Sequence, residues 1–362
     1  MLTRSQKTPV VFVGTYTESE ASQSEGIYVY RMDSASGELS FERVLKGSIN
    51  PSFLAIHPQG GFLYAVNEVQ SYAGQPGGGV SAFSLAADEP KLMNQQPSQG
   101  TDPCYISIEQ TGKFALVANY SSGSVAMFPI QVDGRLGTAT AVIQHSGSSV
   151  HPERQTGPHA HCILPDPTNR FAIAVDLGLD KLLIYAMDLE GGKLKEHAEV
   201  KVQAGAGPRH LTFHPSGGHA YLINELNSTL ISYRYHSEFG SFEELQTVPT
   251  LPRDFRGENL CADVHIAPNG RYLYASNRGH DSIVCFLIDE NTGHLIYQNH
   301  TFTEGREPRN FAIAPKGDFL LVANQKTDNI LTFKIDSRAG KLLKTGHEVK
   351  VSRPVCVKFT YR

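Results

Sequence analysis

Histidine, arginine and carboxylate side chains occur in short motifs along this 362-residue chain. His159 and His161 flank a single alanine. Arg209 directly follows Pro208, and Glu225 lies 16 residues after Arg209. Imidazole groups exchange protons near neutral pH, guanidinium groups bind anions through paired hydrogen bonds, and a carboxylate can act as a base. Together these groups suit an anionic substrate with an acyl or enol centre.

The His159–His161 pair is difficult to explain as core packing. Residues two apart on a strand point to the same face, so both rings are expected on one side. They could chelate zinc if Asp263 or Glu225 supplied a third ligand. Several arginines nearby would oppose a divalent cation, so we expect no metal and no other cofactor. We favour a role in chemistry for His161, and less strongly for His159.

A repeated segment positions these residues. It consists of a proline or its stand-in, a short apolar run, a turn, a second apolar run and then Asn, Asp or Glu. Its copies start near residues 51, 103, 158, 208, 260, 308 and 354, with spacings of 46 to 55 residues. A repeat of this length built from short strands is typical of a β-propeller blade.

Each repeat divides into four strands. In the copy that starts at Pro208 we expect strands at 210–214, 220–224, 229–235 and 242–248, with Pro and Gly residues making the first turn. The N-terminus supplies three strands that lack a first strand, and residues 355–359 supply a first strand without successors. The sequence therefore predicts an all-β, seven-bladed propeller of four-stranded antiparallel blades. We expect one domain over residues 1–362, in which the N- and C-terminal strands share a blade and so close the ring.

Antiparallel pairing places the start of each first strand beside the end of the second strand. Polar residues at both positions should therefore crowd one mouth of the central channel. The candidates are His159, His161, Arg209, His210, Glu225, Asp263, Asn277, Arg278, Arg309 and Asn324. Asparagines at strand ends often only close turns, and His57 and His214, at the far ends of first strands, are expected to be structural. The loop from Gln144 to Gln155 precedes the histidine pair and is a candidate cover for the mouth.

Composition excludes several classes of protein. The 32 Lys and Arg nearly balance the 36 Asp and Glu, which argues against a dedicated nucleic-acid binder. No apolar run is long enough to span a bilayer, so we expect no membrane association. The N-terminus lacks a secretory signal pattern, and the five cysteines form no CxxC pair. We therefore expect a cytoplasmic protein with buried, reduced cysteines.

The chain resembles the seven-bladed propeller lactonases, a family that includes bacterial propeller-type 6-phosphogluconolactonases and the fungal carboxy-muconate lactonizing enzyme. The resemblance runs over nearly the whole chain. It is carried by the motifs Val13-Gly-Thr-Tyr-Thr17, Gly157-Pro-His-Ala-His161 with Asp166-Pro-Thr168, Gly207-Pro-Arg-His-Leu211, Asn224-Glu225, Ala262-Asp-Val264, Ser276-Asn-Arg-Gly-His280 and Glu307-Pro-Arg-Asn-Phe311. By motif, the family's site residues correspond to His161, Arg209, Glu225 and Arg278.

The resemblance implies a lactone-handling site at the channel mouth, in a family with both hydrolysing and cyclising members. Our hypothesis is hydrolysis of 6-phosphoglucono-1,5-lactone to 6-phosphogluconate, a step of the pentose phosphate pathway. In our hypothesis Glu225 activates water, Arg209 or Arg278 stabilises the oxyanion, and His161 protonates the ring oxygen. The remaining one of these two arginines, or Arg309 with Asn324, would hold the phosphate. The substrate would also contact His159, His210, Asp263 and Asn277.

Two other functions fit the same residues. One is a lactonizing isomerase acting on a carboxy-muconate, and the other is a non-enzymatic propeller that binds protein partners. The expected partner is a small anionic lactone, without nucleic acid or membrane, and the expected state is a monomer or weak homo-oligomer.

Overall fold

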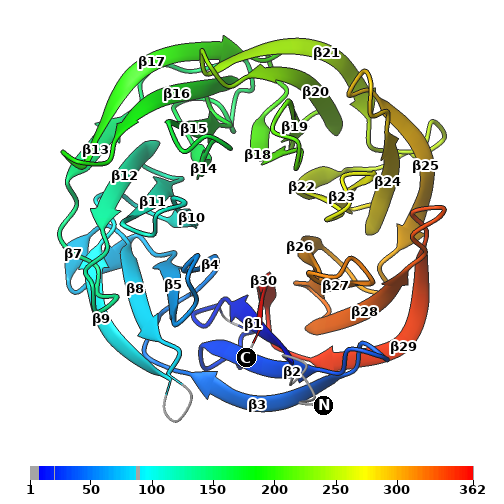
Figure 1. The fold of residues 1–362 in the computed structure, drawn as a ribbon, viewed down its shortest axis with the longest axis horizontal. Helices are drawn as coiled ribbons and strands as arrows, with labels where there is room; N and C mark the ends of the chain where they lie inside the picture. The colour runs from blue at the N-terminus through cyan, green and yellow to red at the C-terminus, as the bar shows by residue number, and fades with distance from the viewer. Residues whose placement is uncertain (1–7, 20, 87–89, 362) are drawn as a thin grey trace, which may run out of the picture.

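The computed structural model describes residues 8–19, 21–86 and 90–361. In these residues seven four-stranded antiparallel sheets stand around a common axis (Figure 1). The fold is therefore the predicted seven-bladed β-propeller. Among the described residues, no helix has the length and apolar character needed to cross a membrane.

The blades follow one another in chain order around the ring. From the innermost strand outward, the first three sheets contain β30 (Pro354–Tyr361), β1 (Pro9–Thr15), β2 (Ile27–Met32) and β3 (Leu39–Leu45); β4 (Leu54–Ile56), β5 (Phe62–Asn67), β8 (Gly79–Ser84) and β9 (Lys91–Pro97); and β10 (Pro103–Ile108), β11 (Phe114–Asn119), β12 (Ser124–Pro129) and β13 (Ala141–Gln144). A small hairpin of β6 (Ser71–Tyr72) and β7 (Gln75–Pro76) is inserted between β5 and β8.

The other four sheets repeat this pattern. They contain β14 (Ala160–Pro165), β15 (Phe171–Asp176), β16 (Lys181–Asp188) and β17 (Lys193–Lys201); β18 (Pro208–Phe213), β19 (His219–Asn224), β20 (Thr229–His236) and β21 (Ser241–Pro249); β22 (Leu260–Ile266), β23 (Tyr272–Arg278), β24 (Ser282–Ile288) and β25 (Leu295–Phe302); and β26 (Pro308–Ile313), β27 (Phe319–Asn324), β28 (Asn329–Ile335) and β29 (Leu342–Lys350). The strands of the Pro208 repeat lie within two residues of their predicted bounds.

The apolar core lies between neighbouring blades. Ile173 of β15 and Leu222 of β19, for example, belong to one buried cluster that joins two sheets. Polar contacts repeat at the same interfaces. Tyr64, Tyr221 and Tyr274 each donate a buried hydrogen bond of 2.9–3.0 Å to a glycine carbonyl of the next blade. These bonds satisfy the hydroxyl groups that would otherwise be costly to bury.

Histidines at the far ends of two first strands are structural, as predicted. A ring nitrogen of His57 lies 3.0 Å from the carbonyl of Gly112, and one of His214 lies 2.9 Å from that of Gly270. Both contacts join one blade to a turn of the next. These two histidines therefore belong to the blade interfaces.

The ring closes through the two ends of the chain. β1 pairs with β30 from Pro9 opposite Tyr361 to Thr15 opposite Pro354. β30 is thus the innermost strand of a sheet whose other strands come from the N-terminus (Figure 1). This composite blade confirms the predicted closure and leaves the ring without a free inner edge at that point.

Gly14 should be essential to this closure. A Cβ at Gly14 would lie 2.3 Å from the carbonyl oxygen of Pro51 and 3.2 Å from the Cβ of Cys356. We expect Gly14→Ala to lower the free energy of unfolding by about 1–3 kcal/mol, because the added methyl group forces blades apart. Chemical denaturation measures this change. Gly157→Ala is the matched control, since a Cβ there meets nothing within 4 Å; equal stability of the two variants would contradict the prediction.

Candidate active site

A β-bulge at the start of the innermost strands aims side chains at one end of the ring axis, which we call the mouth. In β18 the pairing with β19 steps from Pro208 to His210 and skips Arg209. The same irregularity skips Cys104 in β10, His161 in β14 and Arg309 in β26. In β22 the skipped residues include Asp263. Because bulges redirect side chains, each of these blades delivers at least one unpaired position to the same region.

Glu225 is the centre of a buried charge cluster at the mouth. Its Oε1 accepts a hydrogen bond from Arg154 Nη2 at 2.7 Å. Its Oε2 lies 2.9 Å from Arg209 Nε and 2.9 Å from Arg278 Nη2. Three guanidinium groups from different parts of the chain therefore share one carboxylate. The predicted contact between Arg209 and Glu225 is confirmed.

The protonation states of this cluster follow from its geometry. Burial would raise the pKa of Glu225, but Arg278, Arg209 and Arg154 outweigh burial and lower this pKa to about 2. Burial and the charges of Arg278 and Arg309 lower the pKa of Arg209 to about 10. At neutral pH Glu225 is thus ionised and Arg209 is charged. The cluster holds an excess of positive charge that an anion could neutralise.

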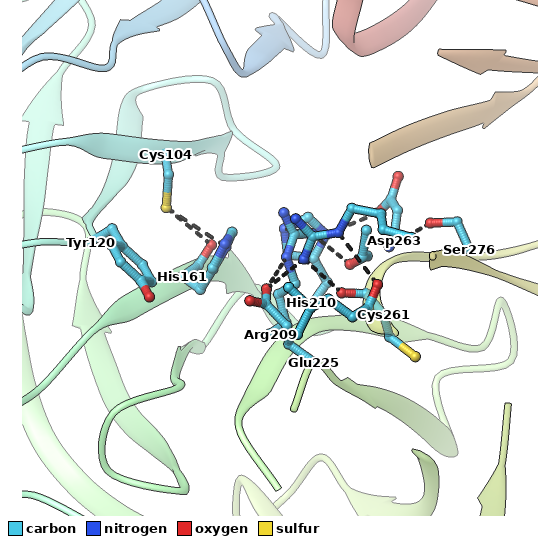
Figure 2. Close-up of polar contacts among 12 residues, drawn as sticks. Cys104, Tyr120, His161, Arg209, His210, Glu225, Cys261, Asp263 and Ser276 are labelled. Carbon is cyan, nitrogen blue, oxygen red and sulfur yellow. Dashed lines mark hydrogen bonds and ion pairs between the residues drawn. The ribbon is translucent and has the colours of Figure 1, made fainter. Parts of the chain in front are cut away.

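A second network fixes Arg209 from behind. Its Nη1 donates to the carbonyl of Ala262 at 2.5 Å and lies 3.2 Å from Nε2 of His210. Asp263 accepts from Nδ1 of His210 at 2.9 Å, from His265 at 2.9 Å and from Asn310 at 2.5 Å. Figure 2 shows Arg209, His210, Glu225 and Asp263 gathered in one group.

His210 and Asp263 are more structural than the sequence suggested. Burial, followed by the charge of Arg209, lowers the pKa of His210 to about 3. Burial opposes ionisation of Asp263, but His265 and hydrogen bonds from the two histidines hold its pKa well below the ordinary value. Both side chains are almost fully buried and engaged with protein groups. We predicted that they bind substrate; the structure instead engages Asp263 with protein groups alone, while His210 contacts Asp263 and Arg209 and also lines a small cavity with Arg209 and Arg309.

His161 faces the charge cluster from the neighbouring blade. Its ring packs edge-on against Tyr120 and His210, with centroids 5.4 and 5.3 Å away (Figure 2). Its Nδ1 lies 3.7 Å from the sulfur of Cys104, and among the described residues its Nε2 has no hydrogen-bond partner. Burial, then Arg209, His210 and Arg309, lower the pKa of His161 well below its ordinary value. The ring is therefore neutral at physiological pH.

The two histidines of the pair share one aromatic neighbour, as expected for side chains on one face. His159 stacks on Tyr120 with a centroid distance of 4.5 Å, and its Nδ1 lies 3.0 Å from the Tyr120 carbonyl.

The thiol of Cys104, next to His161, stays protonated because burial raises its pKa well above the ordinary value. All five cysteines are free and buried, which confirms their predicted packing role.

Arg309, on β26, lines a small cavity together with Cys104 and Arg209. Its guanidinium group sits over the ring of Tyr16 at 5.7 Å, and among the described residues it makes no hydrogen bond or ion pair. Burial would lower the pKa of Arg309, but Tyr16, Glu68 and Glu225 raise it. Arg309 is therefore a charged donor with its N–H groups available for a ligand.

The loop that the sequence offered as a cover contributes a site residue, Arg154. Arg154 Nη2 donates to Glu225 and to the hydroxyl of Tyr120 at 3.0 Å, while about a third of the side chain remains exposed. The loop is anchored by His145, whose Nδ1 lies 2.6 Å from Asp176 and whose Nε2 lies 3.0 Å from the Tyr185 hydroxyl. The sequence analysis missed Arg154 because the loop carries no repeat pattern. The available signal was that Arg154 lies shortly before the histidine pair in the sequence.

Asn277 and Asn324 do not belong to the group of side chains at the mouth. Both are fully buried. Asn277 donates to the carbonyl of Thr250 and accepts from its hydroxyl, and Asn324 donates to the carbonyl of Thr303. We predicted that they bind substrate, and this prediction is corrected: like many asparagines at strand ends, they satisfy nearby backbone groups.

Comparison with known proteins agrees with this geometry. The family model described as "Lactonase, 7-bladed beta-propeller" matches residues 10–359. The chain belongs to this family. It is 36% identical to a 6-phosphogluconolactonase of Bacillus subtilis over 353 residues, covering 97% of this chain and 98% of the relative.

Two further lactonases are similar to this chain over most of its length. A 6-phosphogluconolactonase of Formosa agariphila is 34% identical over 317 residues, covering 84% of this chain and 86% of the relative. The structure of the Pseudomonas aeruginosa periplasmic gluconolactonase has a TM-score of 0.91 and 35% identity, covering 98% of this chain and 99% of that one.

Burying neutral histidines should make the protein sensitive to acid. His210 has a pKa of about 3 in the folded protein against an ordinary value of 6.5. As the pH falls below 6.5 the unfolded chain binds a proton and the folded one does not, so stability is lost progressively down to pH 3. Replacing His210 by Gln should reduce the slope of unfolding free energy against pH by about 1.4 kcal/mol per pH unit between pH 6 and 4.5.

Urea unfolding at a series of pH values measures this slope. Gln retains an amide donor for Asp263, so the variant removes the titrating ring with little change in hydrogen bonding. His236→Gln is the control, because His236 is exposed on β20. Identical slopes for wild type and His210→Gln would show that His210 does not remain neutral in the folded protein.

Proposed function

We propose that the protein hydrolyses a sugar-acid lactone at the mouth, specifically 6-phosphoglucono-1,5-lactone to 6-phosphogluconate. The observation that carries this proposal is the group of three arginines paired with Glu225, with Arg309 as a fourth arginine nearby and a neutral imidazole, His161, beside them. This group carries more positive than negative charge. Two relatives named 6-phosphogluconolactonase support the phosphorylated substrate, and the Pseudomonas structure, named a gluconolactonase, supports the lactone class.

Lactone hydrolysis makes three demands on a site. Water adds to the carbonyl carbon, the carbonyl oxygen becomes an oxyanion, and the ring oxygen takes up a proton as its bond to carbon breaks. Arg209 uses Nε and Nη1 within the protein and Arg278 uses Nε and Nη2, so each keeps one nitrogen without a partner among the described residues. These nitrogens, held rigidly, suit the developing oxyanion.

The structure changes two roles in the hypothesis that the sequence suggested. Both oxygens of Glu225 accept from arginines and its pKa is about 2, so it is a poor base for water. We assign Glu225 to holding Arg154, Arg209 and Arg278 in place. His161 is neutral rather than charged, so we assign its Nε2 to a hydrogen bond with the reacting lactone instead of delivery of a stored proton.

Arg309 is the best candidate for the anionic group of the substrate. Its guanidinium group has no competing carboxylate within hydrogen-bond distance among the described residues, and a phosphate could accept from it in bidentate fashion. Its predicted helper Asn324 is not available, as described above. The pentose phosphate pathway and the cytoplasm follow as proposals from this substrate; the Pseudomonas structure is of a periplasmic protein.

Substitutions of Arg209 and Arg154 should affect the kinetics of lactone hydrolysis differently. Arg209→Met removes an oxyanion donor and should lower kcat by about 100–1000-fold. Arg154→Met removes a partly exposed group at the rim and should mainly raise KM. Steady-state hydrolysis of 6-phosphoglucono-1,5-lactone, corrected for spontaneous opening, measures both effects. If Arg209→Met kept wild-type kcat, this site would not be the place of hydrolysis.

A paired substrate assay tests the phosphate. We expect kcat/KM for the 6-phosphorylated lactone to exceed that for glucono-1,5-lactone, and Arg309→Met to abolish this preference while it leaves hydrolysis of the unphosphorylated lactone measurable. Equal rates on both lactones in wild type would remove phosphate recognition from the proposal. Formation of a lactone from a carboxy-muconate in the same preparation would favour the isomerase instead.

A further inference from the structure

The assignment of Glu225 to positioning leaves the proposed reaction without a base. Among the carboxylates near the mouth, Asp263 is also fully engaged, by His210, His265 and Asn310. Glu68 differs from both. It follows Asn67 at the end of β5, where its backbone N–H donates to the carbonyl of Asn50.

Only one oxygen of Glu68 has a partner. Oε1 accepts from the hydroxyl of Tyr16 at 2.9 Å. Oε2 is buried and has no hydrogen-bond partner among the described residues. A buried carboxylate oxygen without a donor is costly, so its presence calls for a ligand or a water molecule that occupies it.

The space beside Glu68 is suited to water. Glu68 lines a cavity together with Ser52, Cys104, Arg209, Arg309 and Asn310. The centre of a water-sized sphere can occupy about 10 Å³ of this cavity, which is room for about one molecule. The hydroxyl of Ser52 is a second buried polar atom without a partner among the described residues. Two residues that line one small cavity thus each carry an unsatisfied polar atom, and such atoms are the partners that a bound water molecule needs.

We propose that Glu68 is the catalytic residue that binds the attacking water and takes its proton in the proposed lactone hydrolysis. Water in the cavity donates one hydrogen to Oε2 of Glu68. As its oxygen bonds to the lactone carbonyl carbon, that proton moves to Glu68 and the carbonyl electron pair moves to the oxyanion, beside the guanidinium groups. When the oxyanion collapses, the bond from carbon to the ring oxygen breaks and the ring oxygen takes the proton from Glu68.

The surroundings of Glu68 fit this cycle. The charged and titratable groups that face it or its cavity are Tyr16, Cys104, Arg209, His210 and Arg309. Arg309 lies close enough to stabilise the carboxylate by its charge yet makes no hydrogen bond with it. Glu225, by contrast, is directly bonded to three guanidinium groups. One carboxylate thus orders the cations while the other keeps a free oxygen for proton transfer.

The test compares Glu68→Gln with wild type on 6-phosphoglucono-1,5-lactone and glucono-1,5-lactone. This inference rests on the proposed function. We expect Glu68→Gln to lower kcat by about 100-fold or more on both substrates, to leave KM nearly unchanged, and to remove the acidic limb of the pH–rate profile. The control is Glu190→Gln, an exposed carboxylate at the outer turn between β16 and β17, which should match wild type.

Further measurements separate chemistry from folding. Thermal unfolding reports whether each variant is folded. Glu68→Ala should regain part of its rate with added formate, which can enter the space left by the side chain, and a purely structural role predicts no such rescue. If Glu68→Gln fails to fold, Glu68→Asp should fold with lower kcat and a retained acidic limb.

The outcomes are distinct. Wild type that hydrolyses neither lactone overturns the proposed function and this inference with it. Active wild type with an equally active Glu68→Gln or Glu68→Asp variant overturns the inference alone. Loss of rate in Glu68→Gln with an unchanged acidic limb and no formate rescue in Glu68→Ala also overturns it, and makes the free Nε2 of His161 the remaining base.

Discussion

The site depends on the burial of one carboxylate among three guanidinium groups. Glu225 offers two oxygens, and Arg154, Arg209 and Arg278 occupy both of them. Taking such charges out of water is expensive, and the arrangement is stable only because each charge has close partners of opposite sign. The surplus of positive charge cannot be met by the carboxylate alone. This positive charge can bind a substrate that is anionic or becomes anionic in the transition state. The excess of arginines over carboxylates therefore lowers the stability of the protein but raises its affinity for such a substrate.

The propeller makes this arrangement possible through a repeated irregularity. Regular antiparallel pairing would send alternate side chains into the interfaces between blades. The bulge at the start of the inner strand frees one position in each of four blades, and the freed positions carry Cys104, His161, Arg209 and Arg309. Because these side chains leave from rigid sheets, their relative positions are fixed before a ligand arrives. Preorganised donors of this kind are the form of electrostatic stabilisation that enzymes use most effectively.

The fold could be predicted from the sequence because its signal is repeated. Six copies of one pattern carry both strand and turn residues, and a seventh supplies a first strand. The strands of the Pro208 repeat were located to within two residues. The bulged positions were also visible, since most directly follow a proline. What could not be read from the pattern was which polar residues at strand ends turn inward. Asn277 and Arg278 are neighbours in the sequence, yet one satisfies backbone groups and the other reaches Glu225. The position of Arg154 depends on a loop that is held by the contact between His145 and Asp176. These two residues are 31 positions apart, so no local sequence pattern predicts their contact.

The closure of the ring has a consequence for synthesis of the protein. β30 is the last strand in chain order among the described residues, and the backbone N–H of Val357 within it donates to Asn310, which in turn donates to Asp263. That chain of contacts continues through His210 to Arg209. A nascent chain from which residues 354–361 have not yet left the ribosome therefore lacks these contacts behind the guanidinium group of Arg209. The active centre can form in full only after residues 354–361 have been made, so a chain that stops before them lacks both the closed ring and this support.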